Sequence, residues 1–306
     1  MITRKLFTFF VFVFIFIGLC FGQAGKDYVS PYIGKLKYVP AGSFTIQDIY
    51  EATTDTFAYT KYIGTSTVSA FRMSEHEITR AQYVAVTGLK DPSDTRCSTG
   101  MNDPVQNVRW YHALVFCNKL STLEGLTPVY SIKGSIDPAA WGAVPSEDSE
   151  SWNAVIADWS ANGYRLPTEM EWMWAAMGAD TDNPGIVNTT GYNKDFSGSN
   201  GSNNIGEYGW FFENSNSTTH PVGTKHANEL GLYDMSGNVW EWCWDWYIVY
   251  PTGSTTNYRE TASSGHRVSR GGSWFSNTSG ASIAIRNYYS PYRGRNGLGL
   301  RVVRSN

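Results

Sequence analysis

Residues 231–242 read GLYDMSGNVWEW, and this is the most informative stretch of the sequence. It leads into four tryptophans at every second position, Trp240, Trp242, Trp244 and Trp246. Because side chains alternate between the two faces of a strand, this spacing predicts an extended strand with all four indole rings on one face. We expect that face to be a wall of the core, since aromatic rings bury large apolar areas.

The other face of this strand is predicted to carry Glu241 and Asp245, directly after a Gly-Asn turn. Two interpretations of the turn remain open. In the first, Gly237, Val239 and Glu241 supply carboxylate and carbonyl oxygens to a structural calcium ion. In the second, the segment is an ordinary solvated turn. We expect no other metal or cofactor.

Outside this stretch, helices are predicted to begin at Thr79, near Trp110 and at Thr168. Thr79 and Thr168 are each followed three residues later by Gln or Glu, which is the capping-box pattern at a helix N-terminus. Gly88 and Gly125 are expected to end the first two helices, since glycine is common just beyond a helix C-terminus. Short strands and turns account for most of the remaining chain.

The composition is that of a loop-rich globular protein with a large core. The chain has 306 residues, of which 42% are hydrophobic and 15% aromatic, and its formal net charge is −3. Nucleic acid is therefore not expected as a partner, because binding to phosphates needs clustered Lys and Arg. Residues 188–219 are rich in Asn, Ser, Gly and Thr but contain Trp210, Phe211 and Phe212, so we interpret them as a surface segment of one domain, not a linker.

The first 24 residues are predicted to be a signal peptide. Arg4 and Lys5 precede an almost wholly apolar run over residues 6–20, which is too short for a typical membrane-spanning helix. Ordinary cleavage at the small residue Gly22 or Ala24 and lipid attachment at Cys20 both remain open. We expect an exported protein, either a cell-surface or outer-membrane lipoprotein or a secreted or periplasmic one, with a lipid anchor as its only membrane contact.

Three cysteines remain after removal of that segment, Cys97, Cys117 and Cys243. Two arrangements are open for them: one disulfide plus a buried thiol, or three buried thiols. The five histidines are scattered and no closely spaced Cys pair occurs, so a structural zinc site is not expected.

Seven short segments, in order along the chain, carry a resemblance to a known family. They are VPAGSF (39–44), EITRAQY (77–83), PVQNVRW (104–110), YRLPTE (164–169), GLYDMSGNVWEW (231–242), RGGSW (270–274) and GLR (299–301). In these the sequence resembles the formylglycine-generating-enzyme (sulfatase-modifying factor) family, whose fold is a variety of the C-type lectin fold. The resemblance implies a single α+β domain over residues 25–306, rich in irregular loops.

The resemblance does not extend to the residues on which the family's enzymatic activity depends. Members that oxidise a substrate cysteine carry two cysteines between the RGGSW segment and the closing Gly-Phe-Arg, where the thiolates bind copper and engage the substrate thiol. Here those positions fall at or near Thr278 and Ile283, and no cysteine follows Cys243. We therefore expect no enzyme. The alternative is an oxidoreductase of the formylglycine-generating type, or of the iron-dependent type that uses a His/His/Glu cluster.

The segment that replaces this site, residues 275–297, reads FSNTSGASIAIRNYYSPYRGRNG. It is dominated by Tyr, Ser, Asn, Gly and Arg and contains no acidic residue, which is the composition of an antibody paratope. On composition alone an ordinary polar loop is an equally good interpretation. The position between RGGSW and GLR, near the C-terminus, resembles the variable region of retroelement-diversified surface proteins, here about residues 270–301.

This resemblance implies a surface-displayed ligand-binding protein with a diversifiable recognition face. The expected ligand-contacting residues are Phe275, Ser276, Asn277, Ser279, Gly280, Asn287, Tyr288, Tyr289, Ser290, Tyr292, Arg293, Gly294, Asn296 and Gly297. Trp274, Arg286, Pro291 and Arg301, with residues 281–284, are expected to be scaffold. The expected partner is an extracellular protein or a carbohydrate, and the sequence favours neither.

Overall fold

The structure, a computed structural model, describes residues 25–46, 64–98, 100–180, 187–188, 191, 194–250 and 253–305. The predicted signal peptide over residues 1–24, with Cys20 and the alternative cleavage site, lies outside these residues. Within the described part of the chain, no helix has both the length and the apolar character needed to span a bilayer.

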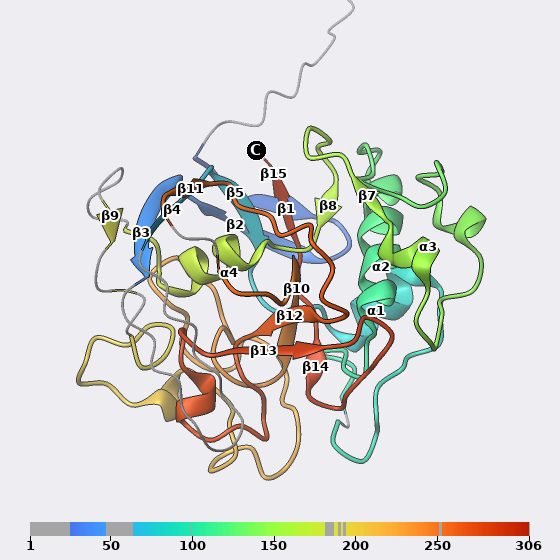
Figure 1. The fold of residues 1–306 in the computed structure, drawn as a ribbon. Coiled ribbons are helices and arrows are strands. Elements are labelled where there is room, and N and C mark those ends of the chain that lie inside the picture. The colour runs from blue at the N-terminus through green and yellow to red at the C-terminus, as the bar shows by residue number, and fades with distance from the viewer. Residues whose placement is uncertain are drawn as a thin grey trace, which may run out of the picture.

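Two sheets form the centre of the molecule (Figure 1). The first has the order β1-β2-β5-β15-β8, with β1 (Tyr28–Ser30), β2 (Gly34–Val39), β5 (Phe71–Ser74), β15 (Val303–Ser305) and β8 (Tyr164–Arg165). The second has the order β13-β12-β10-β14, with β13 (Arg286–Tyr289), β12 (Arg267–Arg270), β10 (Trp240–Trp246) and β14 (Leu298–Gly299). Strands β13 and β14 of the second sheet lie within the expected variable region.

A third sheet and several helices complete the single domain. The sheet has the order β11-β4-β3-β9, with β11 (Thr255–Thr256), β4 (Gly64–Val68), β3 (Gly42–Ile46) and β9 (Val187–Asn188), and β6 (Tyr130–Ser131) pairs separately with β7 (Ile156–Ala157). The helices are α1 (Arg80–Thr87), α2 (Trp110–Leu123), α3 (Glu150–Asn153) and α4 (Glu169–Ala176), with 3₁₀ turns η1 (Pro138–Trp141), η3 (Ile205–Glu207) and η4 (Ser279–Ala281). This is the expected loop-rich α+β domain.

The helix predictions are confirmed at their starting residues. The Thr79 hydroxyl accepts a hydrogen bond from the Gln82 amide at 3.2 Å, and the Gln82 side chain accepts one from the Thr79 amide at 2.9 Å. Thr168 and Glu171 form the same reciprocal box at the start of α4. Gly88, with φ of 65°, ends α1 in the left-handed conformation that glycine adopts readily.

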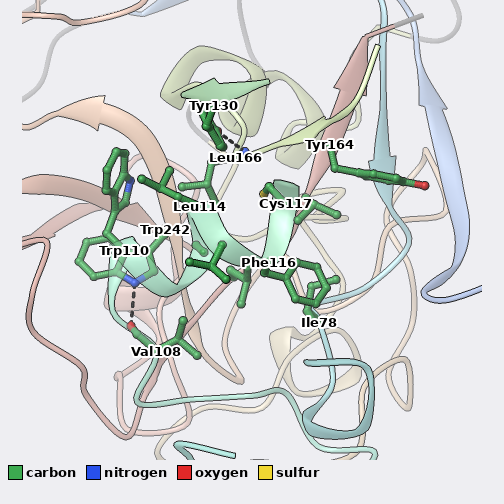
Figure 2. Packing of buried hydrophobic residues seen from close by; sticks show 14 of the residues in the cluster. Ile78, Val108, Trp110, Leu114, Phe116, Cys117, Tyr130, Tyr164, Leu166 and Trp242 are labelled. Atoms are coloured by element: carbon green, nitrogen blue, oxygen red, sulfur yellow. Dashed lines mark hydrogen bonds between the residues drawn. The ribbon is translucent and has the colours of Figure 1, made fainter. Parts of the chain in front are cut away.

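The tryptophan strand β10 separates two hydrophobic cores. Trp240, Trp242 and Trp244 pack into a core with α2, and the Trp242 indole donates a hydrogen bond to the Val108 carbonyl at 2.9 Å (Figure 2). Cys243, on the opposite face, belongs to a second core with α4. The predicted wall of indole rings is therefore confirmed for Trp240, Trp242 and Trp244, but Trp246 is not part of that core and the strand is buried on both faces.

The expectation of a solvated turn before β10 is wrong. Residues 237–239 and Glu241 are all buried. The Nε of Arg301 donates to both carboxylate oxygens of Glu241, at 2.9 and 2.8 Å, and the Trp172 indole donates to one of them at 2.6 Å. No cluster of three or more His, Cys, Asp or Glu suited to a metal occurs among the described residues. The calcium interpretation, which uses main-chain oxygens of Gly237 and Val239 beside Glu241, stays a prediction.

Asp234, in the same stretch, is also buried, and only one of its two carboxylate oxygens has a hydrogen-bond partner among the described residues. Its Oδ2 accepts a hydrogen bond from the Gly223 amide at 2.7 Å, whereas Oδ1 has no partner among the described residues. Burial raises the pKa of Asp234 to about 6. Its backbone φ of 56° is left-handed, a conformation that Asn tolerates as well as Asp.

Replacing Arg301 with Met should lower the free energy of unfolding by about 3–5 kcal/mol, because Glu241 would stay buried without its charged partner. Guanidinium denaturation at neutral pH measures this change. Lys35→Met is the matched control, since the ion pair of Lys35 with Glu75 lies at the surface, and it should cost about 0.5 kcal/mol at most. If Arg301→Met lowers the free energy of unfolding no more than Lys35→Met does, the buried pair of Arg301 with Glu241 does not stabilise the fold.

Asp234→Asn should reduce the pH dependence of stability. The folded-state pKa of Asp234 lies above the value of the unfolded chain, so this group makes the protein less stable as pH rises through about 6. Between pH 5 and pH 8 the free energy of unfolding should fall by about 1 kcal/mol more in the wild type than in Asp234→Asn, since one pKa unit corresponds to about 1.4 kcal/mol. Glu213→Gln, at an exposed carboxylate, serves as control. Parallel wild-type and Asp234→Asn pH curves would show that Asp234 does not titrate in this range.

Candidate ligand-binding face

The segment 275–297 surrounds a groove of about 520 Å³ at the edge of the second sheet. Most of the residues that line it were expected to contact ligand. They are Phe275, Ser276, Asn277, Gly280, Asn287, Tyr289, Asn296 and Gly297, together with Trp240, Ser273 and Arg295. The structure thus brings the two ends of the segment and strand β13 together around one concavity.

Exposed aromatic rings stand at the rim of this groove. The Phe275 side chain is 66% exposed and contacts Phe212, which is 56% exposed, edge to face with ring centroids 6.0 Å apart. Phe212 comes from the irregular segment before residue 219, and its amide donates to the Ser276 carbonyl at 2.9 Å. Its neighbour Phe211 is buried, as expected for a segment that belongs to the same domain.

Strand β13 divides the expected contact residues between its two faces. Asn287 and Tyr289 line the groove, whereas Tyr288 packs against Tyr247 and His266 at centroid distances of 4.4 and 5.0 Å. Tyr288 and Tyr289 were both expected to contact ligand, but they lie on different faces of β13, because neighbouring residues of a strand point to opposite faces.

The remaining expected contact residues lie around the groove. Tyr292, Arg293 and Gly294 border a second hollow, and Ser279 borders a third. Ser290 is half-buried, and its carbonyl accepts a hydrogen bond from the Arg293 amide at 2.9 Å.

Gly294 is not freely exchangeable, contrary to expectation. A Cβ at Gly294 would lie 2.3 Å from the Asn107 carbonyl oxygen, so any larger residue there requires a shift of the backbone. Gly280 and Gly297 are buried, and a Cβ at either position would lie 3.1 Å from a serine side chain, a contact that a small movement of that side chain relieves. The exposed members of the expected set are Phe275, Asn277, Ser279, Tyr288, Arg293 and Asn296.

A buried carboxylate holds the segment against the core. Glu169, at the start of α4, pairs with Arg270 at 2.6 Å through one oxygen and with Arg286 at 2.7 Å through the other. Burial favours the neutral acid, but the guanidinium groups of Arg286 and Arg270 outweigh it, and the pKa of Glu169 is lowered. The Arg286 side chain is only 7% exposed, as expected for a scaffold residue.

Arg270 also fixes the backbone of the segment directly. Its Nη1 donates to three successive carbonyls, those of Ile283, Ala284 and Ile285, at 3.1, 3.0 and 3.0 Å. Arg286 in turn donates to the Ile248 carbonyl at 2.9 Å. The guanidinium groups therefore set the path of the chain between the groove-lining loop and β13.

Further hydrogen bonds reach main-chain oxygens of the segment from outside it. Two side chains donate: Ser236 Oγ to the Ala281 carbonyl at 2.8 Å and Trp274 Nε1 to the Asn296 carbonyl at 2.9 Å. Three backbone amides also donate: Trp110 to the Pro291 carbonyl at 3.0 Å, Asn107 to the Arg295 carbonyl at 2.7 Å and Trp240 to the Gly297 carbonyl at 2.8 Å. Because these bonds use only main-chain atoms of the segment, exchange of its exposed side chains leaves them intact.

The sequence of the whole described domain matches one known family. The sulfatase-modifying factor enzyme 1-like domain, or FGE-sulfatase domain, covers residues 27–306. The chain belongs to this family. The match confirms the expected family and, with the observed elements, the C-type-lectin-type α+β fold.

Individual proteins resemble the chain over most of its length. The chaperone protein LppX of Paenibacillus barcinonensis is 36% identical over 258 residues, which are 78% of this chain and 81% of that protein. The formylglycine-generating enzyme of Mycobacterium tuberculosis is 30% identical over 233 residues, 67% of this chain and 71% of the enzyme. The solved structure of Treponema denticola variable protein 1 (TvpA) superimposes with a TM-score of 0.74 at 30% identity, covering 92% of this chain and 99% of that one.

This FGE-sulfatase domain has no thiol at the positions where the sequence comparison places the family's reactive pair. Thr278 is exposed and Ile283 is buried. Cys97, Cys117 and Cys243 are all free and buried, which resolves the two open arrangements in favour of three buried thiols. Cys97 lies near the groove, with its Sγ 3.9 Å from the Asn296 carbonyl oxygen. Burial raises the pKa of its thiol, so the thiol is protonated at neutral pH.

Sequence reasoning missed several residues of this face. Phe212 is distant in sequence and gave no signal beyond its apolar character. Arg295 lies within the segment and was passed over, and Trp240 was assigned wholly to the core although it also lines the groove. The buried pairing of Arg270 with Glu169 joins two of the family segments, and only their spatial juxtaposition reveals it.

Glu169→Gln should lower the free energy of unfolding by about 3–5 kcal/mol, because Arg270 and Arg286 would lose their buried carboxylate. It should also speed proteolytic cleavage within residues 275–297, since the Arg270 contacts to that backbone would loosen. Denaturation and limited proteolysis measure the two effects, with exposed Glu147→Gln as the matched charge control. Equal cleavage rates in both variants would argue against a role of Glu169 in holding the segment.

Proposed function

We propose that the protein is a non-enzymatic, surface-displayed binding protein in which residues 270–301 form a diversifiable recognition face. One observation carries the proposal: the main chain of residues 275–297 is held by donors outside those residues, among them Arg270, while several exposed side chains, including Phe275, Asn277 and Asn296, line a groove of about 520 Å³. Such an arrangement allows the contact residues to change while the fold is kept. The similarity to a variable protein over 92% of the chain supports it.

The placement of the face in the molecule suits display on a surface. Strands β1 and β15 lie at the upper end of the view in Figure 1, whereas η4 and the loop before β14 lie at the lower end. A chain attached to a surface through the residues that precede β1 would therefore present the groove away from that surface. The similarity to LppX and to the variable protein supports an exported protein, with Cys20 lipidation as one proposed mode of attachment.

An extracellular protein suits the groove better as ligand than a carbohydrate does. Phe275 and Phe212 offer a prominent apolar contact beside adaptable Asn and Ser side chains, the combination typical of protein-binding surfaces. The chaperone name of LppX favours the same ligand class. Arg295, at the groove, adds a charged donor.

Exchange of the exposed face should leave the fold intact. The combined variant Phe275→Ser, Asn277→Ser, Tyr288→Asn and Asn296→Ser should lose no more than about 2 kcal/mol, since single surface changes cost about 0.5 kcal/mol or less. Ile283→Ala, a single buried change in the same segment, should cost about 2–5 kcal/mol. Urea denaturation compares the two. A combined variant that is less stable than Ile283→Ala would show that the face is core, and the proposal would fail.

Genomic sequence and metal content test the other parts of the proposal. Diversification predicts a near-identical repeat of the segment's DNA beside this gene, differing mainly at adenines and adjacent to a reverse transcriptase gene. Related isolates should then differ at the codons of the exposed residues and agree at Gly294 and Arg286. Stoichiometric copper or iron in the purified protein, together with turnover of a thiol substrate, would instead establish the oxidoreductase alternative.

A further inference from the structure

A separate hollow of about 360 Å³ lies beside the groove, where the start of α2 meets the loop after Tyr292. We call it the Arg109 hollow. It is lined by Pro92, Asn107, Arg109, His112, Ser146, Tyr292, Arg293 and Gly294. The lining thus combines two arginines with several neutral polar groups and contains no carboxylate.

Neither arginine has its charge neutralised within the described part of the chain. Arg109 donates through Nη1 to the carbonyls of Val144 and Pro145, at 3.4 and 3.1 Å, and forms no ion pair there. Arg293 is exposed, and its guanidinium lies over the Tyr292 ring at 5.2 Å from the centroid. Backbone carbonyls and an aromatic ring hold the two side chains in place but leave both positive charges available to an anion.

Nearby carboxylates have partners elsewhere. Asp91 pairs with Arg80, and Asp94 pairs with Arg96, each at 2.7 Å. Asp148, in the loop after Ser146, accepts a hydrogen bond from the Asn153 side chain at 2.9 Å. Glu147 is exposed and does not line the hollow. No carboxylate that lines the hollow therefore neutralises the charges of Arg109 and Arg293.

The neutral groups around the hollow are suited to donate to an anion. His112 Nδ1 accepts a hydrogen bond from the Arg109 amide at 3.3 Å, which leaves the ring proton on Nε2. Burial and the neighbouring Arg109 lower the pKa of His112 to about 4, so the ring is neutral at physiological pH. The hollow also adjoins the N-terminus of the 14-residue helix α2, where the helix dipole favours negative charge.

We propose that the Arg109 hollow is a binding site for an oxyanion: a phosphate, sulfate or carboxylate group of a ligand. Arg109 and Arg293 contact the anion from two sides, and Ser146 and Tyr292 complete its hydrogen bonds. The site goes beyond the recognition face, since Arg109, His112 and Ser146 lie outside residues 270–301. The site depends on both arginines. Because Arg293 belongs to the segment, a version of the face that replaces Arg293 would keep only the charge of Arg109.

Anion titration of the full mature chain tests this site. Inorganic sulfate, inorganic phosphate and acetate are added separately at low ionic strength, and amide NMR shifts of Arg109, Ser146 and Gly294 are followed. We expect saturable shifts with at least one of these anions. Arg109→Gln and Arg293→Gln should each weaken that binding about tenfold or more, because each loses a charge-assisted hydrogen bond worth at least about 1.4 kcal/mol.

Arg96→Gln is the matched control, since Arg96 is exposed, already paired with Asp94 and absent from the lining. It should leave the affinity unchanged. Tighter binding of sulfate and phosphate than of acetate would support a phosphate- or sulfate-bearing ligand, whereas tighter binding of acetate would support a carboxylate. Equal shifts with chloride at the same ionic strength, no saturation with any of the three anions, or unchanged affinity in both Arg109→Gln and Arg293→Gln would overturn the inference.

Discussion

The carboxylate of Glu169 is the contact on which the recognition face depends. It lies at the first residue of α4, inside the protein, and pairs with Arg270 from β12 and Arg286 from β13. A carboxylate buried between two guanidinium groups can satisfy both oxygens, and loss of such a partner is far more costly than loss of a surface pair. The pairs fix the edge of the second sheet relative to the core, and through Arg270 they fix the loop that precedes β13.

Strand β10 shows how the same region serves both stability and recognition. Its indole face closes one core and its Glu241–Cys243 face closes another, so the strand has no solvated side. Trp240 belongs to the first core and also forms part of the groove wall. The face therefore rests on a strand that is buried along its whole length, and a ligand would contact a rigid support through exchangeable side chains.

Much of the fold follows from local sequence, and much of the site does not. The capping boxes at Thr79 and Thr168 and the tryptophan repeat are local patterns, and each predicted the correct element. The environment of Glu241 was mispredicted because alternation along a strand tells which residues share a face but not what covers that face. The partner Arg301 lies 60 residues away, and Phe212 reaches the groove from a segment with no regular structure. Such contacts depend on tertiary packing, which one sequence does not reveal.

The three carbonyls bound by Arg270 have a thermodynamic consequence for association. A free loop must be ordered when a ligand binds, and that entropy is subtracted from the affinity. Here residues 283–285 are already held in the unbound protein, since their hydrogen bonds come from a side chain that is itself buried. Differences in affinity between versions of the face would then reflect mainly their side-chain contacts, and such differences appear mainly in the rate of dissociation.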